Sequence, residues 1–223
     1  MATQSNPANV GLSMWKVLLT PNSASIHLIL FSTLFGSHFF HGFIGGPVTF
    51  QQVPRKTFGL MQSKIFPIYF AMGTVTPAAL IGNLALAQGS LSAVPTFPLA
   101  ALGISMVANA INWLYLGPKA TNVMFERHEL EREEGIDAYK DKDKASPKMK
   151  QLSKTFGQLH GISSLLNLTS FGALILHGSV SVAASVLSVW SSLLLLLLLL
   201  ARRRYTRGRT ALDCLVAPVM TIS

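Results

Sequence analysis

The sequence predicts an all-α integral membrane protein, a polytopic bundle of transmembrane helices. Only 12% of the 223 residues are charged, about half of the roughly 25% that is usual in a soluble domain. The charges also gather in three clusters that are separated by long uncharged stretches. This blockwise pattern is typical of chains that cross a bilayer, so the lipid bilayer is the first expected partner.

Three uncharged apolar stretches have the length of a single crossing. They cover about residues 24–44, 65–87 and 96–116, and a helix needs about 20 residues to cross a hydrocarbon layer of about 30 Å. The connection between the second and third stretches, residues 88–95, is short, uncharged and contains Gly89 and Pro95. These two helices are therefore expected to form an antiparallel hairpin.

The next uncharged stretch, residues 161–201, is too long for one crossing at a helical rise of about 1.5 Å per residue. A break at His177, Gly178 and Ser179 would divide it into a fourth helix over about 160–176 and a fifth over about 182–200. The predicted organisation is then a polar segment over 1–23, a helical bundle over 24–180 that includes a charged loop over 117–157, and a C-terminal apolar helix with an arginine-rich tail over 181–223.

The positive charges favour five helices over four. Arg55, Lys56 and Lys64 follow the first span, nine lysines and arginines lie in the 117–157 loop, and five arginines follow the last span. With five helices all three basic segments lie on one side, which the positive-inside rule assigns to the cytoplasm. With four helices the arginine-rich tail lies on the opposite side. No retention or transit signal is evident, so the endomembrane system is the default location.

The loop over 117–157 carries nine cations and eight anions. Its first part, residues 122–134, is rich in helix formers, and Gly135 is a plausible helix stop. This part is interpreted either as a solvated extension of the third helix or as an arm that recruits protein partners. The stretch over 140–150 is expected to be disordered.

Polar side chains inside the spans are the features that indicate function, because they are costly against lipid. Residues of the fourth span recur at helical spacing on one face, and Asn112 of the third span could meet them. We therefore predict one buried polar cluster of Asn112, His160, Ser163, Ser164 and Asn167. Similar polar seams are formed by Ser105 and Asn109 in the third span, Ser170 in the fourth, His38 and His41 in the first, and Thr76 and Asn83 in the second. Such seams either supply hydrogen bonds between helices or line a polar cavity.

Several other functions lack their sequence signals. The chain has no nucleophile elbow, zinc-protease motif, phosphate-binding loop or dinucleotide fingerprint, so it is not expected to be an enzyme or to hold a cofactor. His38 and His41 could ligate a metal only with further ligands such as His160, and no cysteine or carboxylate accompanies them. The net charge of +9 comes without a basic stripe interleaved with aromatics, which argues against nucleic acid as a partner.

One motif near the second span makes physical sense at a membrane surface. Arg55 and Lys56 can bind lipid phosphate, Phe66 belongs to an aromatic belt, and Pro67 is tolerated at a helix start.

The run over residues 55–70 resembles the signature of the transmembrane protein 205-like family. This resemblance implies an interfacial motif of Arg55, Phe58, Gly59, Gln62, Ser63, Lys64, Phe66 and Pro67. A second set of residues, Asn112, Pro118, Met124, Glu131, Glu133 and Gly135, resembles the end of that family's third helix and its charged extension. The run over 160–168 resembles its fourth-helix motif. The resemblance covers residues 24–180 and implies a bundle of four helices without an established biochemical activity.

The functional prediction is a multipass membrane protein that binds or transports a small solute or lipid through a polar seam between helices. The alternative is a structural or adaptor protein that recruits partners through its charged loop.

Overall fold

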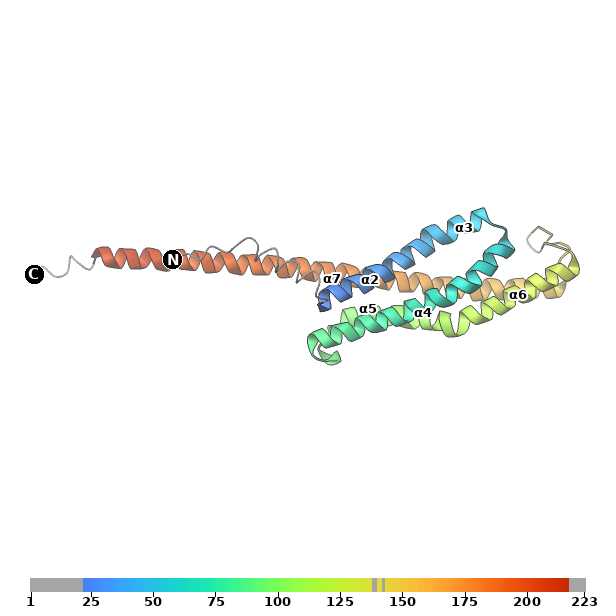
Figure 1. The fold of residues 1–223 in the computed structure, drawn as a ribbon, viewed down its shortest axis with the longest axis horizontal. Helices are drawn as coiled ribbons and strands as arrows, with labels where there is room; N and C mark the ends of the chain where they lie inside the picture. The colour runs from blue at the N-terminus through green and yellow to red at the C-terminus, as the bar shows by residue number, and fades with distance from the viewer. Residues whose placement is uncertain (1–21, 138–139, 142, 217–223) are drawn as a thin grey trace, which may run out of the picture. The chain divides into compact units, whose positions relative to one another are not determined.

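The computed structural model describes residues 22–137, 140–141 and 143–216 (Figure 1). All of its regular elements in these ranges are helices, which confirms the all-α class. In chain order they are α2 (Ser23–Phe39), the π-helix η1 (Phe40–Gly45), α3 (Gly46–Gln52), α4 (Arg55–Gln88), the 3₁₀-helix η2 (Leu91–Ala93), α5 (Thr96–Ile111), the π-helix η3 (Asn112–Leu116), α6 (Gly117–Glu134) and α7 (Pro147–Val216).

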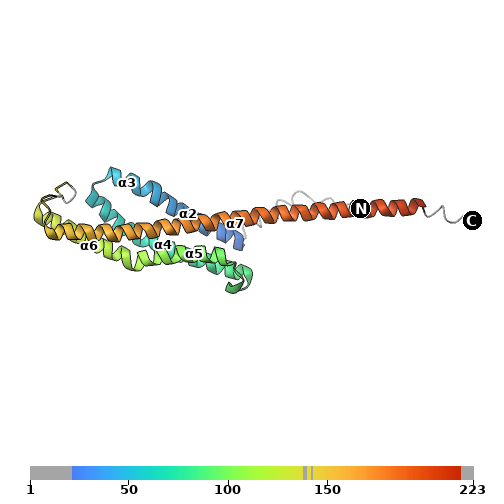
Figure 2. The same ribbon diagram turned by 180° about the vertical axis from the view of Figure 1, so that it is seen from behind.

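These elements join into four continuous helices that are long and apolar enough to cross a membrane, namely Ser23–Gln52, Arg55–Gln88, Thr96–Glu134 and Pro147–Leu199. The first three contain the three predicted spans, which are thereby confirmed. The predicted hairpin is also confirmed, because α4 and α5 run side by side (Figures 1 and 2). Its turn begins at Gly89, whose φ of 81° is left-handed and suits a residue without a β-carbon.

Two crossings contain a short π-helix that is followed by a glycine and a proline. Proline lacks an N–H group, and its ring collides with the carbonyl four residues earlier. The wider π turn avoids this collision, because the N–H groups of Gly46 and Gly117 bond to the carbonyls of His41 and Asn112, five residues earlier. A β-carbon on either glycine would lie only 2.8 or 2.7 Å from that carbonyl oxygen. The two Gly-Pro pairs therefore set the position of the π-helices.

The second span begins earlier than predicted. Residues 55–64 were expected to form an interfacial turn with Pro67 at the start of the helix, but α4 already begins at Arg55, directly after Pro54. Pro67 therefore lies inside the helix, where it removes one backbone hydrogen bond. The charged segment was placed before the span because charges lie outside the hydrocarbon layer, but a helix can begin beyond that layer.

The predicted fifth helix is wrong as a separate element, because α7 continues through the proposed break at residues 177–179. Gly178 had been interpreted as a turn residue. Instead, a β-carbon at this position would lie 2.7 Å from the ring of Phe31 on α2. Glycine therefore allows the Phe31 ring to pack closely against α7 here, and its backbone does not have a positive φ.

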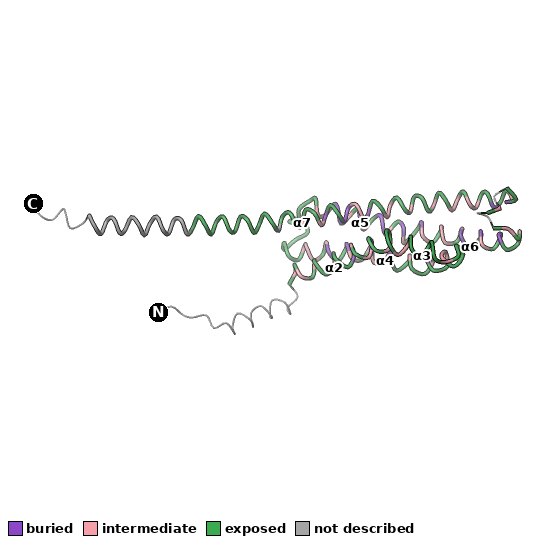
Figure 3. The backbone as a smooth tube through the Cα atoms, turned by 90° about the horizontal axis from the view of Figure 1, so that it is seen from above, coloured by how far each residue is buried: buried purple, intermediate pink, exposed green. Residues whose placement is uncertain are grey.

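The chain divides into two compact units, residues 1–178 and 179–223. In the second unit the described side chains are mostly apolar and exposed, including the leucines over 193–199 (Figure 3), which is the surface expected of a helix in lipid. The predicted placement of all three basic segments on the cytoplasmic side required five crossings. It does not follow from the four crossings of the structure.

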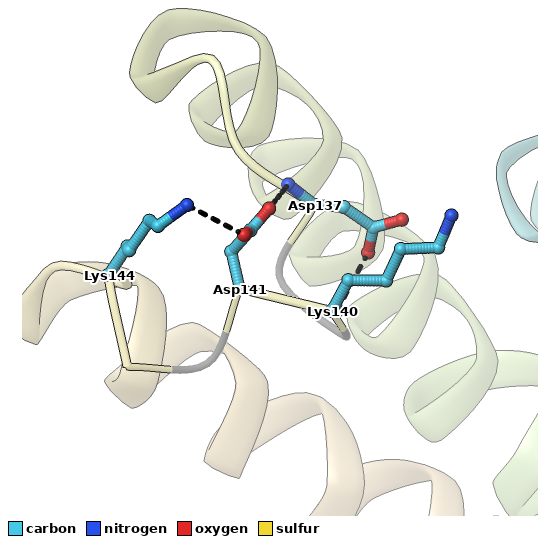
Figure 4. Close-up of polar contacts among 4 residues, drawn as sticks. All are labelled: Asp137, Lys140, Asp141 and Lys144. Carbon is cyan, nitrogen blue, oxygen red and sulfur yellow. Dashed lines mark hydrogen bonds and ion pairs between the residues drawn. The ribbon is translucent and has the colours of Figure 1, made fainter.

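The charged loop is largely helical. α6 continues the third crossing to Glu134 and ends at Gly135, whose φ is 64°, so the predicted extension and its stop are confirmed. The expectation of disorder over 140–150 is wrong for the part that the structure describes, because α7 begins at Pro147. Before it, the Asp141 carboxylate accepts hydrogen bonds from the Asp137 backbone N–H at 3.2 Å and from Lys144 Nζ at 3.1 Å (Figure 4).

These contacts hold the pKa of Asp141 below its ordinary value of 3.8, chiefly through the Asp137 N–H group and then through Lys144. Because the pKa is lowered in the folded loop, the stabilisation is present above pH 3.8 and is lost as the pH falls through the lowered pKa. We expect an NMR titration of the Asp141 carboxyl to give a midpoint below 3.8, and Lys144→Gln to raise it, whereas Lys148→Gln should have little effect. An unchanged midpoint in Lys144→Gln would contradict this assignment.

Candidate functional site

A network of buried polar side chains joins α5 to α7. Ser105 Oγ and Ser170 Oγ lie 2.8 Å apart, and Asn109 Nδ2 donates to Ser170 Oγ at 2.7 Å and to the Ser105 carbonyl at 2.9 Å. All three side chains are fully buried. On the α4 side the Asn109 amide lies directly against Gly73, where a β-carbon would come within 2.5 Å of Asn109 Cγ. Three helices therefore meet at this amide.

A second contact ties α4 to α7, and the first crossing packs beside it. Tyr69 donates its hydroxyl to Asn167 Oδ1 at 2.9 Å. The ring of Tyr69 packs against His38 and His41, with ring centroids 4.7 and 4.9 Å apart. The imidazole of His38 is buried and also neighbours Asn109, which links this contact to the Ser105–Ser170 network.

Asn112 is placed by the π-helix that it begins. Its Nδ2 donates to the backbone carbonyl of Ser163 at 3.1 Å, and its side chain is fully buried. π-Helices often occur at functional sites, and this one places a polar side chain in the interior. We call the combined set the polar seam; it consists of His38, Tyr69, Ser105, Asn109, Asn112, Asn167 and Ser170.

The structure divides the cluster predicted from the sequence. Asn112 and Asn167 belong to the polar seam, and Ser163 contributes its carbonyl. Ser164 and His160 are instead exposed, and the His160 ring stacks on Phe156 of its own helix at 5.8 Å. The predicted single cluster containing His160 is therefore not formed.

The reason lies in the inward-facing stripe of α7, whose buried and half-buried residues repeat every seven positions. It passes through Met149, Phe156, Ser163, Ser170 and His177. A seven-residue repeat is the spacing of helices that pack side by side along their length. His160 and Ser164 lie at the edge of this stripe, so similar sequence spacing did not give them the same environment.

The predicted interfacial motif packs α4 against α6. Gly59 allows the close approach, because a β-carbon there would lie 2.6 Å from Met124 Sδ. Lys56 forms an ion pair with the buried Glu131 at 3.2 Å, and Gln62 is buried. Two other members of the motif contact Phe50 of α3: the Phe58 ring packs on it, and the Arg55 guanidinium lies 5.8 Å from its ring. Within α4, Phe66 stacks on Phe70, and the Ser63 hydroxyl donates to the Leu60 carbonyl. Lys64 and Pro67 are exposed.

One pair of titratable side chains was missed by the sequence reasoning. His27 Nε2 and His177 Nε2 lie 3.0 Å apart, and the His177 ring also packs on Phe31 at 5.5 Å. The seven-residue repeat of α7 would have indicated that His177 is buried, but the expected break at this position concealed it. Within the described residues, no group of three or more His, Cys, Asp or Glu side chains is placed to hold a metal ion.

Four crossings with a buried polar interior define an α-helical multipass integral membrane protein. Residues 29–129 match a family model described as a domain of unknown function (DUF4149). The chain is also similar to transmembrane protein 205 of Danio rerio, with 29% identity over 158 residues that cover 66% of this chain and 84% of that protein. The predicted resemblance to the transmembrane protein 205-like family is thereby confirmed. No solved structure matches the chain.

Proposed function

We propose that this protein binds a small polar solute in the polar seam and conducts it across the bilayer. The observation that supports this function is that all four crossings supply polar side chains to one buried region, from His38 on α2 to Asn167 and Ser170 on α7. Polar residues within membrane spans are costly and commonly mark solute pathways.

The competing explanation is that the polar seam only holds the helices together. Hydrogen bonds between membrane helices contribute about 0.6 kcal/mol each, and such a role accounts for the Tyr69–Asn167 and Ser105–Ser170 contacts. It does not account for the buried Asn109 Oδ1 and Asn112 Oδ1, which have no hydrogen-bond donor among the described residues. These unused oxygens favour a solute-binding role.

The adaptor alternative receives less support from the loop. Asp141 bonds to Lys144, and the Glu134 carboxylate accepts from the Ser146 hydroxyl and, at 3.4 Å, from its backbone N–H. Charged side chains that already form contacts within the connection between α6 and α7 are less available to bind a partner protein. We therefore retain solute conduction as the proposed function.

The test uses the full-length chain in liposomes and a panel of small polar solutes, with permeation followed by light scattering after an osmotic shift. We expect at least one solute to permeate faster than in protein-free vesicles, and Asn167→Leu to lower that rate at least fivefold. The same variant leaves the Tyr69 hydroxyl unpaired and should lower the free energy of unfolding by about 0.5–2 kcal/mol.

The matched control is Asn83→Leu. Asn83 bonds to Ser23 through both amide atoms, at 2.9 and 3.2 Å, and does not belong to the polar seam. It should therefore lose similar stability without losing permeation. If Asn167→Leu lost only stability and kept its permeation rate, the polar seam would serve helix packing alone and the proposal would be wrong.

A further inference from the structure

The orientation of the Asn109 amide is determined by its partners. Its Nδ2 group faces the Ser105 carbonyl at 2.9 Å, and a carbonyl oxygen can only accept a hydrogen bond. The second N–H of the amide is used by Ser170 Oγ. Both donors are therefore occupied, and the oxygen Oδ1, fully buried, has no donor within the described part of the chain.

The neighbouring His38 has two neutral tautomers, and its contacts distinguish their consequences. Its Nδ1 lies 3.1 Å from the Leu34 carbonyl, and this contact is a hydrogen bond only in the tautomer whose Nδ1 carries the hydrogen. In a neutral imidazole the other nitrogen, Nε2, is then an acceptor, and it too lacks a hydrogen-bond partner among the described residues. In that tautomer Nε2 and the neighbouring Asn109 Oδ1 are both acceptors and cannot satisfy each other, whereas a hydrogen on Nε2 would be donated to Asn109 Oδ1.

Asn112 repeats the arrangement one helical turn further along. Its nitrogen is used by the Ser163 carbonyl at 3.1 Å, which again determines which amide atom is the oxygen. Asn112 Oδ1 has no donor among the described residues. With Nδ1 of His38 carrying the hydrogen, the three buried and unpaired atoms of the polar seam are all acceptors.

This chemistry selects the ligand. An anion would bring further acceptors and be repelled, whereas a full cation would lose its hydration in a region whose seam residues include no carboxylate. We propose that the polar seam binds small uncharged solutes that donate hydrogen bonds from O–H or N–H groups, of the polyol or urea type, with His38 Nε2, Asn109 Oδ1 and Asn112 Oδ1 as the acceptors. This inference rests on the proposed function and names its substrate class.

The experiment compares neutral donors with ions. Liposomes that contain the full-length chain are tested with glycerol and urea, and in parallel with chloride and potassium. We expect glycerol or urea to permeate at least fivefold faster than in empty vesicles, with no increase for chloride or potassium. His38→Phe and Asn112→Leu should each lower the donor flux at least fivefold, whereas His38→Gln, which keeps an acceptor, should lower it only about twofold. Asn83→Leu is the folded control.

A ¹⁵N NMR spectrum of the histidines tests the protonation state that the argument requires, and His38→Phe identifies the His38 signals. We expect Nδ1 of His38 to carry the hydrogen and Nε2 to be the lone-pair acceptor. A hydrogen on Nε2, in either the neutral or the doubly protonated ring, would overturn the inference, since Nε2 would then be a donor to Asn109.

Different results would contradict the solute class and the conduction of solutes through the polar seam. Flux of chloride or potassium that is lost in the seam variants, without flux of glycerol or urea, would refute the neutral-donor class while retaining conduction through the polar seam. Absence of any flux above empty vesicles, with a folded protein, would refute the proposed function itself.

Discussion

Replacing Gly73 with valine is expected to lower the free energy of unfolding by about 3 kcal/mol, the upper part of the range for inserting atoms into a packed core. A β-carbon at this position would come within 2.5 Å of Asn109 Cγ. The Asn109 side chain cannot retreat without breaking its bonds to Ser105 and Ser170. The variant should therefore separate α4 from α5 and disrupt the polar seam, and an unfolding titration in detergent measures the loss.

Gly82→Val provides the matched control, because Gly82 lies on the same helix and a β-carbon there would have no atom within 4 Å. Both substitutions replace a glycine with the same β-branched residue, so the change in helix propensity is shared. We expect the control to unfold within about 0.5 kcal/mol of the wild type. Equal losses in the two variants would show that backbone propensity, rather than the contact with Asn109, is responsible.

Removing the charge of Lys56 is expected to lower the free energy of unfolding by about 2 kcal/mol. Lys56 is paired at 3.2 Å with Glu131, whose side chain is only 4% exposed. Breaking a fully buried ion pair by removing one partner costs about 3–5 kcal/mol, because the other charge stays buried without compensation. The smaller value is expected here because the lysine side chain is 55% exposed and its attraction is partly screened by water.

A double-mutant cycle tests this explanation. Lys56→Ala should be strongly destabilising, whereas the double variant Lys56→Ala with Glu131→Leu should recover most of the loss, since no buried charge remains. Lys64→Ala removes an exposed cation from the same helix and is expected to change stability by less than about 0.5 kcal/mol. If the double variant were no more stable than Lys56→Ala, the burial of Glu131 would not be the cause.

Much of the architecture could be predicted from local patterns along the chain. The three first crossings, the hairpin turn at Gly89 and the helix stop at Gly135 follow from hydropathy and from residues that adopt a positive φ. These features depend on a few neighbouring residues and on the bilayer thickness, and not on contacts between distant segments. The predicted resemblance also depended on contiguous runs, such as residues 55–70.

The errors occurred where a residue has two possible structural roles. Gly178 was interpreted as a turn, but it allows the close approach of Phe31. Pro67 was placed at a helix start, but it lies within α4. A glycine or a proline has the same identity in both situations, and only the packing of the neighbouring helix distinguishes them.

The sequence by itself determined that this chain crosses the membrane several times as helices and that polar residues lie within those helices. Only the tertiary structure decided which polar residues meet: Asn109 with Ser170, Tyr69 with Asn167, and Asn112 with the Ser163 carbonyl, while His160 is left exposed. The physical reason is that the apolar length of a span depends on composition alone. The partner of a buried side chain depends on how each helix is rotated about its own axis, and that rotation is set by the combined packing of all the neighbouring helices.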